Sequence, residues 1–305
     1  MSELLPEFTA FADASRSDIG RLSAFRARAL RRHLEYGRHM TPYWLLEPDQ
    51  PDANAPAIVF FPGANGHGEI WFPYMLALAK THRCVAISLP PCKNYDDLNA
   101  FLGRVLEECG IKAALFVGTS VGGYAAQVFA RAYPERCLGL ALCLTGTASA
   151  QLPAEVRARW IARGKRRLRM AFQPFGPMFR ATIARQAYVS FCPERHYDSM
   201  VFWREYLVDT FKNYIYKKQY VAIHTDLVPG FYRQYRHEPA DLTGWNRPVL
   251  ILEAPDDPTY GEAERAALRA LYPQATAITL PEGGQFGLYL HETEVVHALE
   301  AWANA

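Results

Sequence analysis

The chain has 305 residues, half of them hydrophobic and 13% aromatic, and its 33 lysines and arginines against 31 acidic residues leave a formal net charge of +2 at pH 7. This composition supplies enough apolar surface for a substantial core and excludes an intrinsically disordered chain. So small a net charge excludes nucleic-acid binding by bulk attraction, so we expect no nucleic-acid partner. No apolar run approaches the roughly 20 residues of a membrane-spanning helix, so we expect no transmembrane segment.

The start of the chain and the cysteines bear on the cellular compartment. Residues 2–7 lack the basic start and the apolar stretch of a signal peptide. The six cysteines are scattered and form no C-x-x-C pair. We therefore expect a cytoplasmic protein with reduced, buried thiols, rather than a disulfide framework or a metal site.

An amphipathic basic helix is predicted within the first 40 residues. Apolar side chains lie at helical spacing opposite arginines, namely Leu22, Phe25, Leu30 and Leu34 against Arg21, Arg26, Arg28 and Arg31. Such a pattern is typical of a surface helix that packs through one apolar face.

The chain then alternates strand-like and helix-like segments. Short apolar runs of strand length lie at residues 57–61, 84–88, 113–117, 138–144, 249–254 and 276–280. Stretches with helical spacing separate them, at residues 94–109, 121–133, 260–271 and 292–303. Short all-apolar strands that alternate with helices predict an α/β fold with a mostly parallel central sheet and helices on both faces.

This alternation is interrupted between residues 147 and 246. The interval has no convincing strand, many arginines and tyrosines, and several helix-like stretches such as residues 200–218. We expect one core, formed by residues 1–146 and 247–305, with an inserted helical cap at residues 147–246.

A G-x-S-x-G motif at residues 118–122 stands directly after a predicted strand and before a predicted helix. That context is the one a nucleophile elbow requires, because Gly118 and Gly122 permit a tight, strained turn that presents Ser120 at the helix N-terminus. The backbone N–H of Val121 would then be one donor to an oxyanion. An ordinary turn between strand and helix is the alternative.

A second glycine-rich loop follows the strand at residues 57–61. Gly63 and Gly66 allow close backbone approach, and Ala64 between them is placed to give the second oxyanion donor through its N–H. The alternative is a plain glycine turn.

With these parts in place, the sequence resembles the α/β-hydrolase fold superfamily over residues 57–146 and 247–303. The resemblance implies that residues 62–66, with Trp71, form the oxyanion loop and that Asp257 is the acid of the catalytic triad. Within the superfamily the chain is most similar to the maspardin branch. The residues that carry this similarity are 271–275, Leu280, 283–286, 294–295, 95–110 and 206–209.

The chain departs from the hydrolase pattern at Gln285. Hydrolases of this fold carry the general-base histidine in the turn after the last strand, and here that turn reads Gly284-Gln285-Phe286. A glutamine amide can neither take the serine proton near pH 7 nor return it, and loss of a triad base costs on the order of a million-fold in rate. His67, three residues past Ala64, is a candidate substitute base. The alternative is a loop histidine that never touches Ser120.

The cap carries two further patterns. Seven basic residues lie within residues 157–169, among aromatic and apolar side chains. Such a helix can bind an acidic protein partner, an anionic ligand or a membrane surface. The alternative is a helix whose basic face is simply solvated. Aromatic side chains across residues 202–235 predict the roof of an apolar pocket above Ser120. A small apolar or aromatic molecule fits this composition best. No P-loop or G-x-G-x-x-G follows the first strand, so we expect no cofactor.

Two classes of function remain open on the sequence. In the first, the protein is a non-standard enzyme acting on a small apolar or aromatic ester, thioester or carbonyl compound. In the second, it is a non-catalytic pseudohydrolase that binds a protein or a small molecule, which the resemblance to maspardin implies. The elbow and its oxyanion donors favour the first class, and Gln285 favours the second.

Overall fold

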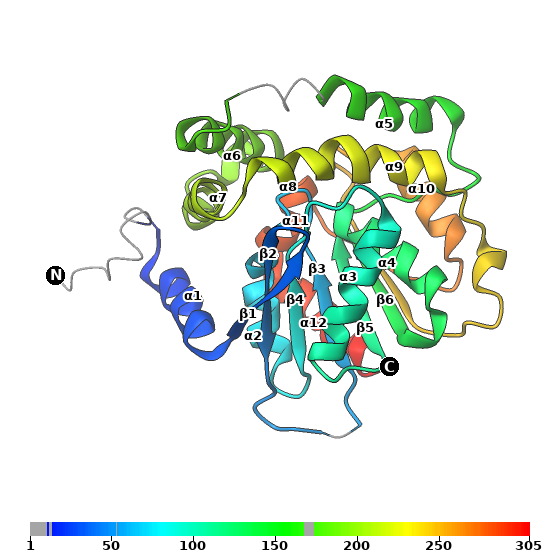
Figure 1. Ribbon diagram of the computed structural model, residues 1–305, viewed down its shortest axis with the longest axis horizontal. Coiled ribbons are helices and arrows are strands. Elements are labelled where there is room, and N and C mark those ends of the chain that lie inside the picture. The colour runs from blue at the N-terminus through cyan, green and yellow to red at the C-terminus, as the bar shows by residue number, and fades with distance from the viewer. Residues whose placement is uncertain (1–10, 12–13, 53, 168–173) are drawn as a thin grey trace.

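The computed structural model describes residue 11 and residues 14–52, 54–167 and 174–305. Within these residues, eight strands form one sheet in the order β1-β2-β4-β3-β5-β6-β7-β8 (Figure 1). The strands are β1 (Leu30–Tyr36), β2 (His39–Leu46), β3 (Ala57–Phe61), β4 (Cys84–Ile87), β5 (Ala114–Thr119), β6 (Cys137–Cys143), β7 (Val249–Glu253) and β8 (Thr276–Thr279). β1 and β2 run antiparallel to their neighbours and all other pairs are parallel, which confirms the predicted mostly parallel sheet.

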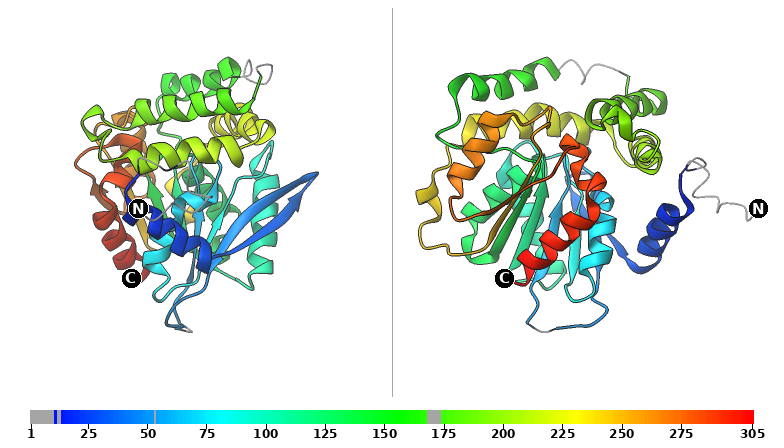
Figure 2. Two further views of the ribbon diagram at one scale, coloured as in Figure 1. Left: turned by 90° about the vertical axis from the view of Figure 1, so that its left-hand side faces the viewer. Right: turned by 180° about the vertical axis from the view of Figure 1, so that it is seen from behind.

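Helices cover both faces of this sheet (Figure 2). Alternate residues of β3 enter opposite clusters, because successive side chains of a strand point to opposite faces: Ile58 and Phe60 pack on one side, Val59 and Phe61 on the other. One cluster includes side chains of α3 (Tyr95–Glu108), α4 (Val121–Ala132) and α10 (Glu262–Leu271). The opposite cluster includes side chains of α1 (Arg16–Arg28), α2 (Phe72–Leu78) and α12 (Glu292–Ala303).

The prediction for the N-terminal region is partly wrong. α1 ends at Arg28, and Leu30 and Leu34 belong to the edge strand β1, not to the helix. Leu34 is buried whereas Leu30 is half exposed, and two apolar residues four apart lie on one face of a strand as well as of a helix. The spacing of the apolar residues therefore could not distinguish a strand from a helix, and the β1–β2 hairpin was not predicted.

The cap lies over the carboxyl ends of the parallel strands (Figures 1 and 2). Its helices are α5 (Ala154–Arg167), α6 (Pro177–Phe191), α7 (Val201–Asn213), α8 (Lys217–Ala222), the π-helical turn η6 (Ile223–Leu227) and α9 (Val228–Gln234). The described residues of the interval 147–246 contain helices and turns and one isolated bridge, between Ser149 and His237. An inserted helical cap was thus predicted correctly, while its limits at residues 147 and 246 stay a prediction.

Two arginines of the predicted basic helix contact other segments of the protein. Arg157 is 4% exposed, and its guanidinium donates to four backbone carbonyls, those of Ala148, Ser149, Tyr232 and Tyr235. Arg159 forms an ion pair with Glu264. The buried Arg157 therefore holds α5 to the rest of the molecule, whereas the side chain of Arg159 stays 55% exposed. Residues 168 and 169 of the predicted helix lie outside the described residues.

Short connecting elements complete the chain. They are the 3-10 turns η2 (Gly68–Trp71), η3 (Pro134–Arg136), η5 (Glu194–His196), η7 (Pro239–Leu242) and η8 (Gly284–Phe286), and helix α11 (Gly287–Leu290). All six cysteines are buried and free, as the sequence predicted. Among the described helices, none is long and apolar enough to cross a bilayer.

Candidate active site

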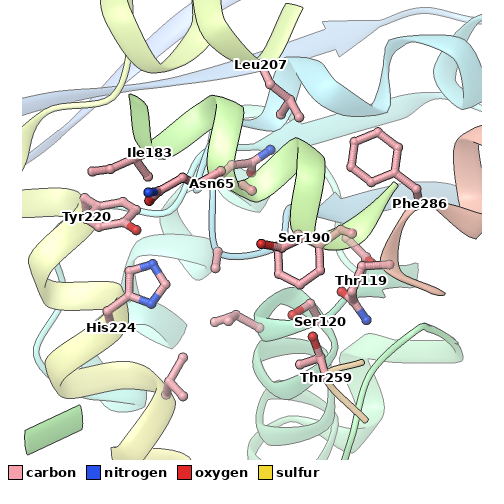
Figure 3. A pocket seen from close by; sticks show the side chains of 18 of the residues that line it. Asn65, Thr119, Ser120, Ile183, Ser190, Leu207, Tyr220, His224, Thr259 and Phe286 are labelled. Atoms are coloured by element: carbon pink, nitrogen blue, oxygen red, sulfur yellow. The ribbon is translucent and has the colours of Figure 1, made fainter. Parts of the chain in front are cut away.

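Ser120 lies on a strained turn between β5 and α4. Its φ of +50° and ψ of −119° are rare for a residue with a side chain. The flanking glycines leave no room for a side chain: a Cβ on Gly118 would lie 2.4 Å from the carbonyl oxygen of Gly122, and a Cβ on Gly122 would lie 2.3 Å from that of Phe61. The strand–turn–helix context that the motif requires is therefore present, and Ser120 faces a cavity (Figure 3).

The loop after β3 lies beside this turn. A Cβ on Gly63 would be 3.5 Å from the Cβ of Ser120, so the two backbones are close neighbours. Gly66 has a φ of +70°, which favours glycine. Gly63, Ala64 and Val121 line the cavity together with Ser120. The structure thus brings both predicted oxyanion donors to the cavity that Ser120 faces.

The Ser120 hydroxyl forms a hydrogen bond with a tyrosine. Ser120 Oγ lies 3.1 Å from Tyr260 Oη, Tyr260 Oη lies 2.7 Å from Tyr124 Oη, and Tyr124 Oη lies 2.8 Å from Tyr232 Oη. Burial raises the pKa of all three tyrosines above the ordinary value, so their hydroxyls are neutral near pH 7. Tyr260 was not among the residues predicted from the sequence, although it stands only three residues after Asp257.

Asp257 anchors the loop that follows β7. Its Oδ1 accepts the backbone N–H of Thr259 at 2.7 Å and of Tyr260 at 3.2 Å. Its Oδ2 accepts Nε2 of Gln285 at 2.6 Å, and the same Nε2 donates to the carbonyl oxygen of Leu144 at 3.0 Å. Two acceptors fix the orientation of the amide, because only its nitrogen can donate to both. Burial raises the pKa of the Asp257 carboxyl. The structure thus brings Asp257 and Gln285 together, and Gln285 lines the cavity that Ser120 faces.

Asp256 binds the backbone of the turn that carries Gln285. Its two carboxylate oxygens accept the backbone N–H groups of Gly283 at 2.9 Å and Gly284 at 3.0 Å. Both glycines have a positive φ, of 103° and 46°. The turn is therefore tied to the acid loop by its backbone, independently of the side chain at position 285.

The structure does not bring His67 to Ser120. The imidazole of His67 stacks on Tyr214 at 5.0 Å between ring centroids and meets Trp44 edge-on at 4.9 Å. It is buried but does not line the cavity at Ser120. Burial lowers the pKa of His67 to about 4. Its position gives no support to a role as substitute base.

A different histidine reaches the cavity from the cap. His224 stands on the π-helical turn η6, with its ring 4.4 Å from that of Tyr220, and it lines the cavity. Figure 3 shows its ring on the cap side, apart from Ser120. The sequence could not place it, because the position of η6 depends on how the cap helices pack.

The cavity has a volume of about 710 Å³ and lies between the cap and Ser120. Its walls are mainly aromatic and aliphatic, including Phe179, Ile183, Leu207, Phe211, Tyr220, Phe286 and Tyr289. Figure 3 labels four of these residues, Ile183, Leu207, Tyr220 and Phe286. Polar groups come from residues that include Asn65, Gln186 and Ser190, and Arg163 adds a charged one. In the part of the chain that the structure describes, no group of three His, Cys, Asp or Glu side chains could hold a metal ion. The cavity suits an apolar compound with few polar atoms.

Comparison with known proteins gives one family. A family model described as the alpha/beta hydrolase fold matches residues 56–292. A solved structure of a hydrolase from Pseudomonas aeruginosa PA01 has a TM-score of 0.70 and 17% identity, covering 90% of this chain and 98% of that one. The enol-lactonase from Burkholderia xenovorans LB400 has a TM-score of 0.67 and 16% identity, covering 87% of this chain and 97% of that one. At such identities the two structures bear on the fold alone.

One curated relative matches a shorter segment. The poly(3-hydroxyalkanoate) depolymerase of Ectopseudomonas oleovorans is 27% identical over 119 residues, which are 36% of this chain and 42% of the depolymerase. The chain therefore matches less than half the length of that relative.

Proposed function

The chain belongs to the α/β-hydrolase fold family, and from this premise we propose that it is a serine enzyme acting on a small, largely apolar or aromatic ester, thioester or related carbonyl compound. The observation that carries the proposal is the position of Ser120. This residue is held on a strained turn at one wall of a mainly apolar cavity of about 710 Å³.

The chemistry follows from the groups around Ser120. The carbonyl oxygen of the substrate would lie against the N–H groups of Ala64 and Val121, and the apolar body would fill the space under the cap. Charge develops on that oxygen when Ser120 Oγ attacks, and each well-placed donor is worth about 3 kcal/mol of transition-state stabilisation. The strained backbone keeps the hydroxyl and these donors in a fixed relation before substrate binds.

The name of one curated relative supports an ester as substrate, because a poly(3-hydroxyalkanoate) is a polyester. The enol-lactonase shares its fold with this chain, and an enol-lactone is a cyclic ester. Gln285 stands where a hydrolase of this fold carries its histidine, so the ordinary Ser-His-Asp route is not part of the proposal.

Covalent labelling tests this function. A fluorophosphonate probe followed by intact-mass measurement should add one label to the wild-type protein and none to Ser120→Ala. Ser190→Ala is the matched control, because Ser190 lines the same cavity but stands on α6, and it should label like the wild type. A wild-type protein that takes no label, or that keeps its label in Ser120→Ala, would remove Ser120 as nucleophile.

The second candidate is a pseudohydrolase similar to maspardin, which binds a small molecule or a protein without turnover. The observation in its favour is the Gln285 amide, whose nitrogen is committed to Asp257 and Leu144 and which has no basic atom. This function predicts that no label is taken up, while an apolar ester still raises the thermal midpoint. A probe that labels Ser120 stoichiometrically would exclude it.

A further inference from the structure

The hydroxyl of Tyr260 is in contact with the reacting atom of the proposed enzyme. It lies 3.1 Å from Ser120 Oγ, and Tyr260 lines the cavity that holds the substrate. On its other side it meets Tyr124 Oη at 2.7 Å, which in turn meets Tyr232 Oη at 2.8 Å. Each hydroxyl can donate one hydrogen bond and accept others. Tyr260 can therefore accept a hydrogen bond from Ser120 while it donates one through its own hydroxyl.

The ring of Tyr260 is fixed from several sides. It stacks on Trp160 with ring centroids 5.4 Å apart, and it meets Tyr124 edge-on at 6.2 Å. Its backbone N–H donates to Asp257 Oδ1 at 3.2 Å, and its carbonyl accepts Arg265 Nη1 at 2.9 Å. Only 2% of the residue is exposed. A ring held in this way keeps its hydroxyl at Ser120 with little loss of entropy on substrate binding.

The surroundings of Tyr260 keep it protonated. Its hydroxyl bonds Ser120, which precedes α4. The titratable and charged groups that face it are Tyr124 on α4, Arg163 on α5, Tyr232 on α9, Tyr95 on α3, and Asp257 and Arg265 from its own segment. Burial is the largest influence and raises the pKa of Tyr260, and the Asp257 carboxylate acts in the same direction. A tyrosine that stays neutral is no general base by itself, because it must give up a proton when it takes one.

We propose that Tyr260 is a catalytic residue that relays the serine proton to the leaving group of an ester, in place of the missing histidine. As the bond from Ser120 Oγ to the carbonyl carbon forms, the serine proton passes to Tyr260 Oη. The proton that Tyr260 carried passes to the oxygen of the departing alcohol as its bond to the carbonyl carbon breaks. The products are an acyl-serine and a neutral alcohol, and Tyr260 ends with one proton as it began.

Deacylation follows the same path in reverse. Water attacks the acyl carbon and gives a proton to Tyr260 Oη, while Tyr260 returns a proton to Ser120 Oγ as the acyl–serine bond breaks. The net reaction is ester plus water to acid plus alcohol. Tyr124 and Tyr232 take no proton in this scheme, and their hydroxyls orient that of Tyr260.

The relay predicts an unusual pH dependence. A histidine base must be neutral, so histidine-dependent turnover falls as the pH drops through about 6.5. Neither Ser120 nor neutral Tyr260 changes charge there, so turnover of an alkyl ester should be flat from about pH 5.5 to about pH 8.5. A fall in turnover with an apparent pKa between about 6 and 7 would overturn the relay and indicate a histidine such as His224.

Tyr260→Phe tests the relay directly, with benzyl butyrate and p-nitrophenyl butyrate as probes. We expect turnover of benzyl butyrate to fall about 100-fold and that of p-nitrophenyl butyrate clearly less, because p-nitrophenolate leaves without a proton. Tyr272→Phe is the matched control. It removes a buried hydroxyl at the end of α10 that bonds Arg131 and does not line the cavity, and turnover should be unchanged. Equal behaviour of the two variants would contradict the relay.

The inference rests on the proposed function, and Ser120→Ala in the same assay separates the two. Turnover retained in Ser120→Ala removes the serine enzyme altogether, whereas loss in Ser120→Ala with turnover retained in Tyr260→Phe removes only the relay. A solvent isotope measurement on the wild type needs no variant. Two protons in flight should give a curved dependence of turnover on the deuterium fraction, and a straight line would count against the relay.

Discussion

The two halves of the site are held by different kinds of constraint. The elbow half, defined as Gly63, Ala64, Ser120 and Val121, is shaped by backbones packed so closely that neighbouring glycines have no room for a Cβ. The acid half, defined as Asp257, Tyr260 and Gln285, is shaped by side-chain hydrogen bonds, such as the 2.6 Å contact between Gln285 Nε2 and Asp257 Oδ2.

Because of this difference, the shape of the acid half does not depend on whether its side chains can exchange a proton. A backbone contact at the van der Waals limit tolerates almost no change of residue. A hydrogen bond to Asp257 requires only an N–H donor, which a glutamine amide supplies as well as an imidazole does. The acid half can therefore keep its shape around a residue that cannot exchange a proton, and the proton path must then run through another group.

Gly122→Ala should have the largest effect, because it breaks the elbow half. Its Cβ would lie 2.3 Å from the Phe61 carbonyl oxygen, so the backbone of β3 or of α4 has to move. We expect the free energy of unfolding to fall by about 3 kcal/mol or more, measured by urea unfolding.

Gly20→Ala is the control for this variant. Gly20 lies within α1, and a Cβ at this position would have no described atom of another segment within 4 Å. The free energy of unfolding should rise by about 0.5–1 kcal/mol, because alanine favours the helix and restricts the unfolded chain. If Gly122→Ala unfolds at the wild-type urea concentration, the elbow half is not held as rigidly as the contact distances imply.

Gln285→His should give the acid half a general base. A ring N–H can replace the amide donor to Asp257 and leave a basic nitrogen on the side of the cavity. We expect turnover of p-nitrophenyl butyrate to rise about 100-fold, equivalent to about 2.7 kcal/mol of transition-state stabilisation. The pH profile should change from flat to one that rises through about pH 6.5 to a plateau, since the new base must be neutral.

Gln285→Asn provides the matched variant, because it keeps an amide and adds no base. It should show no gain and no new pH dependence. A Gln285→His protein that behaves like Gln285→Asn would mean that position 285 is not aimed at Ser120, even though the Asp257 contact is kept.

The sequence predicted those parts of the molecule whose patterns have one structural meaning. The all-apolar run of β3 and the G-x-S-x-G turn were placed correctly, since a buried parallel strand and a glycine-flanked serine each leave a local signature. The β1–β2 hairpin was missed because its edge strand is exposed and arginine-rich, so Leu30 and Leu34 fitted a helix equally well.

The parts of the site that depend on side chains from distant segments could not be predicted. Tyr260 reaches Ser120 because Asp257 Oδ1 takes two backbone N–H groups and curls the loop back, and no periodicity encodes that turn. His224 enters the cavity only through the packing of the cap. His67 was a reasonable candidate by its place in the chain, yet Trp44 and Tyr214 enclose its ring.

The enclosed ring of His67, in the loop after β3, makes the stability of the folded protein sensitive to acid. Burial lowers the pKa of His67 to about 4, with Glu69 opposing the shift and Arg26 and Arg31 adding to it. The unfolded chain, with an ordinary histidine pKa of about 6.5, therefore binds a proton that the folded protein does not. The stability due to neutral His67 is complete above about pH 6.5 and is lost progressively down to about pH 4.

Replacing His67 should remove this loss of stability at acidic pH and change little else. His67→Phe keeps an aromatic ring between Trp44 and Tyr214, and on acidification from pH 7 to pH 5 its free energy of unfolding should fall by about 2 kcal/mol less than that of the wild type. His297→Gln on α12, an exposed histidine, should follow the wild type. Urea unfolding of the three proteins at both pH values measures the difference. If all three lose stability equally, the acid sensitivity resides in groups other than His67.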